Sequence, residues 1–445
     1  MTDQTSAHPA EETAVIDAPG PTVLGAHFSN GYRTYVLVVM ALVYVVNYLD
    51  RQILGILGHP IKVEFHLSDF ELGILGGPAF AVVYAVLGIP LAIFADRLNR
   101  RNVIAASLVV FSFMTLMCGL AMQYWQLVLA RFGTGVGEAG TSPSINSVLA
   151  DLYPPEKRAS ALAFYSAGLN VGLLVAFFGG GWVAQHYGWR LAFLTAGVPG
   201  LLLGILVLAT VHEPKRGQVE NLIDTAQTAS LWAVIRVLWG QRSFRWIAFG
   251  TGMSSFGGYA GIQFIPSFLV ISHHMTLSEI GVALSLLTGA GGAIGTYMAG
   301  VFADRYGKSD IRWNMYVPII ATFIAIPFAP IFYLSPSTAV CLIGAIVPAM
   351  MGAAYIGPAY SMTQGLVPLR MRARAIAILL FTLNMIGLGL GPPGVGEISD
   401  LLKPFLGADS LRWALMTSII TGLTGAFCYW RASRTLKADL AKYAV

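Results

Sequence analysis

Long apolar runs, separated by short polar turns, repeat along almost the whole chain. Each run is about 20 residues long, which lets a helix cross a hydrocarbon core of about 30 Å. Splitting the chain at its turn and charge clusters predicts twelve spanning helices. Their approximate ranges are 33–57, 70–95, 102–122, 125–151, 159–184, 189–211, 244–271, 278–303, 312–334, 338–366, 373–399 and 410–431.

Composition agrees with a polytopic membrane protein. Of the 445 residues, 56% are hydrophobic and only 11% are charged, about half the charged fraction of soluble proteins. Residues 1–30 are polar and lack the features of a secretory signal, so we expect a disordered cytoplasmic tail. The cysteines lie in apolar runs without metal or redox spacing, and we expect them to pack as small apolar residues: Cys118, Cys341 and Cys428.

Basic residues indicate the orientation in the membrane. Most of the 27 Lys and Arg residues lie in loops on one side of the predicted bundle, and by the positive-inside rule this side is cytoplasmic. Both termini are therefore expected in the cytoplasm, and the net charge of +5 needs no nucleic acid as a partner. A polar interruption at mid-chain predicts two six-helix bundles, 31–211 and 244–431, a cytoplasmic linker at 212–243 and a cytoplasmic tail at 432–445.

The two predicted halves share loop motifs. Asp96-Arg97 after the second span recurs as Asp304-Arg305 after the eighth, 208 residues later. With these repeats the chain resembles the major facilitator superfamily from residue 31 onward. This resemblance implies an all-α fold of twelve helices in two pseudo-symmetric bundles, with a site near the midplane. It also implies a cytoplasmic gating role for the residues of the loop signature: Asp96, Arg97, Arg100, Arg101, Asp304 and Arg305.

Four ionisable side chains interrupt the apolar runs of spans one and four: Asp50, Arg51, Arg131 and Glu138. A charge at bilayer depth costs several kcal/mol, so such residues face polar cavities or one another and mark transport paths. Arg131 and Glu138 are nearly two turns apart on one helix face, while Asp50 and Arg51 point about 100° apart. We expect a neutral, coupled cluster in which protonation of an acid frees an arginine to bind an anion.

The internal repeat separates this cluster from the scaffold. At the repeat offsets the second half has only uncharged residues: Gly258, Tyr259, Ala345 and Gly352. A requirement of the fold should occur in both halves, so we interpret the four charges as the proton-coupling and substrate site, with structural ion pairs as the alternative. Aromatic and polar residues of other spans are candidates to line the cavity: Tyr48, Tyr259, Gln263, Tyr355, Tyr360, Met362 and Asn384.

Local motifs narrow the family. Two families share the motif Asn47-Tyr48-Leu49-Asp50-Arg51: the Spinster-like transporters and the anion:cation symporters of sugar acids. Two other motifs resemble bacterial-type Spinster proteins more closely: the Gly-x-Gly-Glu-Ala-Gly form at 135–140 and the Gly-Pro-rich stretch at 387–394. Spinster resemblance implies transport of amphipathic lipids such as lysophospholipids or sphingosine phosphate.

The function expected is therefore proton-coupled secondary transport, by alternating access, of an amphipathic or anionic substrate across the inner membrane. The alternative is a proton symporter for sugar acids or other organic anions, and a non-transporting receptor or a membrane enzyme comes after it. No nucleophile–base or metal constellation stands in any span, so we expect no enzyme, no metal and no cofactor beyond protons as the coupling ion. A monomer in the lipid bilayer is expected.

Overall fold

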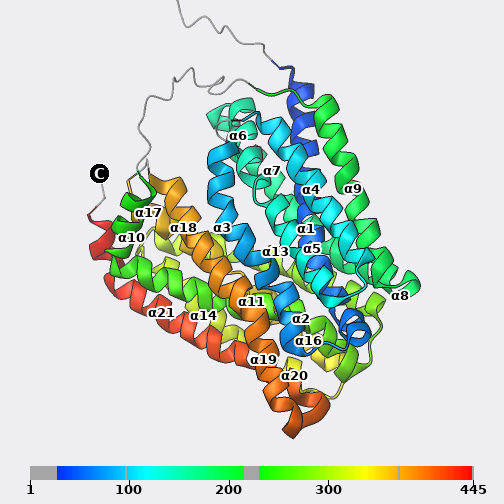
Figure 1. Cartoon of the computed structure of the whole chain (residues 1–445). Helices are drawn as coiled ribbons and strands as arrows, with labels where there is room; N and C mark the ends of the chain where they lie inside the picture. Colours follow the sequence, from blue (N-terminus) through cyan, green and yellow to red (C-terminus); the bar gives the residue numbers. More distant parts are fainter. Residues whose placement is uncertain (1–27, 96–97, 215–229, 369–370, 443–445) are drawn as a thin grey trace, which may run out of the picture.

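The computed structural model describes residues 28–95, 98–214, 230–368 and 371–442, and these are almost entirely helical (Figure 1). The first six predicted spans form the N half. Three of them are single helices: α1 (Asn30–Phe65), α4 (Arg100–Leu120) and α9 (Trp189–Thr210). The other three consist of consecutive segments: α2 (Asp69–Gly76) with α3 (Pro78–Ala95), α5 (Tyr124–Glu138) with α6 (Thr141–Leu152), and α7 (Pro155–Leu174) with η1 (Val175–Gly179) and α8 (Gly180–Tyr187).

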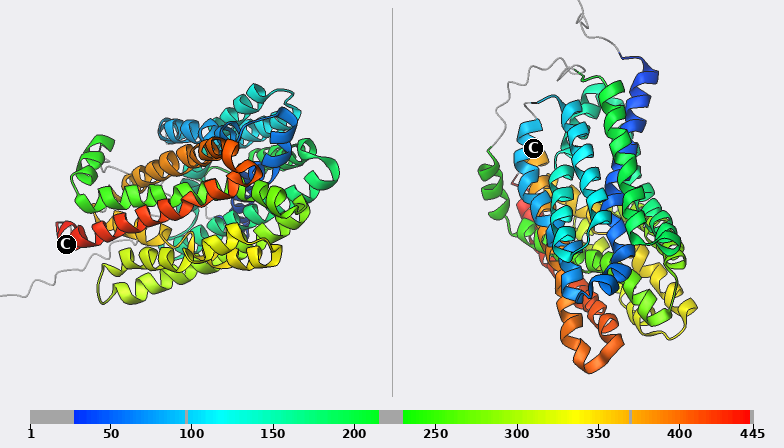
Figure 2. Two further views of the ribbon diagram at one scale, coloured as in Figure 1. Left: turned by 90° about the horizontal axis from the view of Figure 1, so that it is seen from below. Right: turned by 45° about the vertical axis from the view of Figure 1, so that its right-hand side comes forward.

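The last six spans form the C half. They are α11 (Arg242–His273), α12 (Leu277–Leu284) with η2 (Ser285–Gly291) and α13 (Gly292–Gly307), α14 (Trp313–Ala325) with α15 (Phe328–Leu334), α16 (Thr338–Met351) with α17 (Ile356–Gly365), α18 (Arg372–Leu383) with η4 (Asn384–Leu388) and α19 (Gly389–Leu406), and α20 (Ser410–Leu415) with α21 (Thr417–Leu440). Figures 1 and 2 show each half gathered in a bundle of its own.

Helices are also present in the segments predicted as cytoplasmic linker and C-terminal tail. The segment predicted as linker contains a helix, α10 (Leu231–Trp239), which buries Val234 and Leu238 against the C-half core. Helix α21 continues to Leu440 because Leu436 is buried in that same core and Asp439 accepts hydrogen bonds from Ser243. Most of the predicted N-terminal tail lies outside the described residues.

Among the described residues, nine helices are long and apolar enough to span a membrane, or ten if α14 and α15 are one bent span. The remaining predicted spans are not separate helices of that length, because they are joined to a neighbouring span or divided into shorter helices. One continuous stretch, Arg372–Leu440, contains spans eleven and twelve together. Span four is divided into α5 and α6 at Ala139–Gly140, so neither part reaches the required length. The twelve-helix prediction is therefore confirmed.

Spans five, eight and eleven each contain a π-helical turn: η1, η2 and η4. A π turn widens the helix locally and is common at functional sites. In this protein η1 contacts α12, η2 contacts α7 and η4 contacts α3. Since each of these contacts joins the N half to the C half, the π turns lie at the boundary between the two bundles.

The large core that the two halves share lies at one end, and a small cluster of Phe80, Ala81 and Leu388 also crosses the boundary between them. We define the outer end as the end holding the α1–α2, α11–α12 and α19–α20 connections, and the inner end as the opposite one. At the outer end one hydrophobic cluster includes Ile53, Leu57 and Phe177 of the N half with Phe264 and Ile280 of the C half. At the inner end each half has a cluster of its own. In Figure 1 the C-half helices α11 and α21 lean away from α1 and α9 toward the inner end. The structure is therefore closed at its outer end.

Candidate functional site

Two ion pairs link α1 to α5 within the N half. Arg51 Nη2 lies 2.5 Å from Glu138 Oε1, and the side chains are 9% and 5% exposed. Arg131 Nη1 lies 3.6 Å from Asp50 Oδ2, with side chains 1% and 2% exposed. Each acid thus pairs with the base of the other helix. The structure brings all four predicted residues together, as a neutral set.

The pairing around Asp50 is the looser of the two. Its Oδ1 lies 2.5 Å from the Thr115 hydroxyl of α4, but its buried Oδ2 has no hydrogen-bond partner, because 3.6 Å to Arg131 is beyond hydrogen-bonding range. Arg131 also donates to the Asp50 backbone carbonyl at 3.4 Å. A buried carboxylate oxygen without a donor is costly, so this atom is a ready acceptor for a proton.

An aromatic ring lies between the two pairs. The guanidinium carbon of Arg51 is 4.9 Å from the centroid of Phe80, and that of Arg131 is 5.6 Å from the same ring. The Tyr84 and Tyr48 rings lie 4.8 and 5.2 Å from Arg51. Cation–π contacts of this kind stabilise a desolvated arginine. Sequence reasoning did not find Phe80, Tyr84 or Thr115, since nothing distinguishes them from packing residues in an apolar run.

Arg51 alone of the four charged residues lines a cavity between the halves. Gly55, Gly76 and Leu388 are among the other residues around that cavity, which we call the boundary cavity, and two of the predicted lining residues, Tyr259 and Gln263, are there as well. Asp50 instead points into the N half, toward Thr115 of α4. This division agrees with the predicted angle of about 100° between adjacent side chains.

The other predicted lining residues lie elsewhere. Tyr48 is beside Arg51. Tyr355 and Met362 belong to the C-half hydrophobic core, and Tyr360 packs against that core from its edge. Asn384 is buried where η4 begins. Their role in the transport path stays a prediction.

Polar bonds join the halves at the outer end, in a cluster that we call the outer latch. The Asp400 carboxylate of α19 accepts hydrogen bonds from the backbone N–H groups of Asp69 (3.1 Å) and Phe70 (2.8 Å), the first residues of α2. The Ser399 hydroxyl donates to Asp69 Oδ2 at 2.9 Å, while Lys62 of α1 pairs with Oδ1. A carboxylate at a helix N-terminus satisfies free N–H groups and interacts favourably with the helix dipole.

Glycines allow backbone contact between the halves beside this latch. A Cβ added at Gly181 would lie 2.5 Å from the carbonyl oxygen of Leu277, and one at Gly281 would overlap the carbonyl of Phe177. Spans five and eight thus place a glycine of each against the backbone of the other. Leu277 N–H also donates to Gln185 Oε1 at 3.0 Å. Such close approach excludes water and substrate from the outer end.

At the inner end, Arg100 of the loop signature organises the N half. It is 1% exposed. Its guanidinium pairs with Asp151 of α6 and bonds Glu213 (2.7 Å), the Ser147 hydroxyl (2.8 Å) and the Pro214 carbonyl (2.7 Å). The Arg101 backbone N–H donates to the second oxygen of Glu213 at 2.9 Å. These described bonds tie α4 to α6 and to the segment after α9, all within one half.

The remaining members of the loop signature are placed differently. Asp96 and Arg97 lie outside the described residues. Asp304 and Arg305 are exposed at the end of α13. Nearby, Asp310 pairs with Arg312 and with Lys437 of α21, and the hydrogen bonds from Arg312 hold the pKa of Asp310 below its usual range. Whether these signature residues act in gating stays a prediction.

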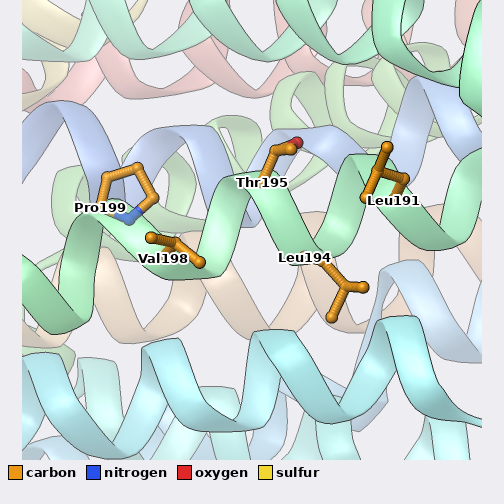
Figure 3. Close-up of a pocket in the computed structure, with 5 residues that line it drawn as sticks. All are labelled: Leu191, Leu194, Thr195, Val198 and Pro199. Carbon is orange, nitrogen blue, oxygen red and sulfur yellow. The ribbon is translucent and has the colours of Figure 1, made fainter.

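A second depression lies on the outward side of α9 (Figure 3). It measures about 330 Å³ and is lined by Leu191, Leu194, Thr195, Val198 and Pro199. None of these side chains can ionise, and the lining is almost entirely apolar. Such a surface on a spanning helix suits contact with lipid tails, and it contributes nothing to the charged site.

Comparison with known proteins agrees with this geometry. The profile of the Major Facilitator Superfamily matches residues 40–392. The chain belongs to the major facilitator superfamily. It is therefore a multi-pass membrane transporter and not an enzyme, and its resemblance to Spinster proteins is confirmed by its similarity to the crystal structure of a bacterial Spinster homolog.

The chain is similar over most of its length to two transport proteins and to one solved structure. An MFS-type efflux pump of Mycolicibacterium smegmatis is 33% identical, over 91% of this chain and 94% of that protein. The cis,cis-muconate transport protein of Acinetobacter baylyi is 28% identical, over 81% and 86%. The crystal structure of a bacterial homolog to the human lysosomal transporter Spinster, inward-facing and unoccupied, superposes with a TM-score of 0.85 at 29% identity, covering 93% of this chain and 99% of that one.

Proposed function

We propose that the protein is a proton-coupled secondary transporter of an amphipathic, anionic, lipid-like molecule such as a lysophospholipid or sphingosine phosphate. The observation that carries the proposal is the position of Arg51. It lines the boundary cavity and is paired, 2.5 Å away, with a buried acid. An arginine held in this way can exchange one anionic partner for another at the interface that alternating access must open and close.

Charge balance would couple the binding of an anion to the uptake of a proton. The four buried residues are neutral together, so an anionic group that pairs with Arg51 adds an uncompensated negative charge. A proton on Glu138 cancels that charge when the anion displaces the carboxylate. Asp50 is the second proton acceptor, because its buried Oδ2 has no hydrogen-bond donor. Anion and proton are therefore expected to bind together.

The proposed substrate class rests on the likeness to Spinster and on the surroundings of Arg51. Aromatic rings flank the guanidinium, and the apolar residue Leu388 lines the same cavity. Once the halves separate, such a site suits a charged head group joined to an apolar body. We place the protein in the inner membrane with both termini cytoplasmic, as the distribution of basic residues indicates.

A second candidate is a proton symporter for sugar acids or other organic anions. It is favoured by the likeness to a cis,cis-muconate transport protein. The two candidates share the charged site and differ in what they require beyond it. A dicarboxylate would need a second cationic or polar contact, whereas a lysolipid needs an apolar path for its chain.

Transport by purified protein in proteoliposomes tests the proposal. Lysophosphatidylglycerol and sphingosine phosphate form one set of substrates, and glucarate and muconate form the other, each across an imposed pH gradient. The proposal expects uptake of the lipid set that depends on the gradient and that small carboxylates do not compete away. Gradient-driven transport of the carboxylates alone would replace it by the second candidate.

A further inference from the structure

The residues that line the boundary cavity include an arginine and neutral polar side chains but no acid. Its polar lining consists of the Arg51 guanidinium, the Gln52 and Gln263 amides and the Tyr259 hydroxyl, and none of its lining residues is acidic. Its volume of about 10 Å³ holds one water molecule at most. Arg51 is paired with Glu138, so an anionic ligand would take the place of that carboxylate, and an arginine beside neutral donors suits carboxylate or phosphate oxygens.

Gln263 is, with Tyr259, a polar residue that the C half contributes to this lining. Its side chain is 4% exposed and extends from α11 across the boundary to two glycines of the N half. A Cβ at Gly76 would overlap its amide, and one at Gly58 would lie 3.5 Å from its Nε2. This Nε2 is buried without a hydrogen-bond partner.

An unpaired buried amide is costly and calls for a partner. The Gln263 amide can turn by 180° about its last bond, so either its N–H donor or its carbonyl acceptor can face the cavity. The glycines let the amide lie directly against the N half, where a side chain at Gly76 would displace it. The donor can therefore be offered to a ligand once the halves separate enough for the ligand to enter.

We propose that Gln263 is a specificity-determining residue that binds, together with Arg51, the anionic oxygen atoms of the transported molecule's head group. The ligand chemistry is a carboxylate or a phosphate. Arg51 supplies the charge from the N half, and Gln263 supplies a hydrogen bond from the C half. An anion bound by both therefore contacts both halves at once. This inference rests on the proposed function and adds a second anchoring residue to it.

Binding to the full-length protein in nanodiscs tests the assignment. The variant is Gln263→Met, which keeps the length and the packing on the glycines but removes the amide. Ser267→Ala is the matched control, because Ser267 is buried one turn farther along α11, has an unpaired hydroxyl and does not line the cavity. The probes are lysophosphatidylglycerol and glucarate, with monoolein as the neutral lipid.

A hydrogen bond to a charged group contributes enough that its loss weakens binding about tenfold or more. We expect this loss for the anionic probe that the wild-type protein binds, with monoolein and the Ser267→Ala variant affected less than twofold. Equal anion affinity in Gln263→Met and wild type would overturn the assignment while leaving the proposed function intact. A wild-type protein that binds neither anion would refute both. An equal loss for monoolein would show that Gln263 acts through packing only.

Discussion

Replacing Asp400 by Asn should loosen the outer end without disturbing the charged site. Asp400 accepts two hydrogen bonds, 3.1 and 2.8 Å long, from the first N–H groups of α2. An asparagine keeps one acceptor oxygen but loses the second bond and the attraction between a full charge and the helix dipole. Together these losses are worth about 1–2 kcal/mol. The equilibrium between outer-closed and outer-open states should shift about 5- to 30-fold toward the open state.

Spin labels at the outer end can measure this shift. Met122 and Phe405 lie in opposite halves near that end and are 74% and 84% exposed, so cysteines there accept labels with little disturbance. Distance distributions should gain a longer component in Asp400→Asn. Glu397→Gln is the matched control, because it removes the same charge from an exposed position one turn away on α19. An unchanged distribution in Asp400→Asn, or the same change in the control, would refute the reasoning.

Three further predictions concern the boundary and the inner end. Gly281→Leu would overlap the carbonyl of Phe177, so the outer-closed state should lose about 1–3 kcal/mol and the same label pair should report opening. Arg100→Gln would remove the cation that pairs with Asp151 and Glu213; it should lower the free energy of unfolding by about 2–3 kcal/mol, and an unchanged melting temperature would contradict this. Gly76→Ala would overlap the Gln263 amide and should lower the melting temperature; adding Gln263→Ala should recover part of that stability, and additive losses would argue against this contact.

The twelve spans could be predicted because lipid imposes a simple rule. A spanning helix needs about 20 apolar residues whatever it packs against, so the local sequence is enough to predict it. The breaks within spans were not predicted. They depend on contacts with the opposite half, such as that between η1 and α12, and no local pattern specifies them.

In the charged site, too, the residues could be predicted from the sequence but their contacts could not. Asp50, Arg51, Arg131 and Glu138 stood out because a charge in an apolar run is rare and costly. Their pairing, Arg51 with Glu138 and Asp50 with Arg131, follows from how two helices are rotated against each other, which the spacing along one helix cannot give. Thr115, which bonds the Asp50 carboxylate, gave no signal.

The outer latch lay beyond sequence reasoning for another reason. Asp69 and Asp400 are 331 residues apart, and acids at helix ends are ordinary. Only the approach of α2 to α19 gives Asp400 the free N–H groups as partners. The loop signature, by contrast, directed attention to Arg100, but its acidic partner Glu213 lay in a segment interpreted as linker.

Proton flux driven by substrate tests the central claim, that the buried charges couple an anion to protons. Protein is reconstituted in vesicles that contain a pH-sensitive dye, and the transported anion is added without an imposed gradient. Wild type should change the internal pH in step with uptake. Asp50→Asn and Glu138→Gln should abolish that change, with folding of each variant verified by monodisperse elution in detergent. A pH change of wild-type size in both variants would contradict the account.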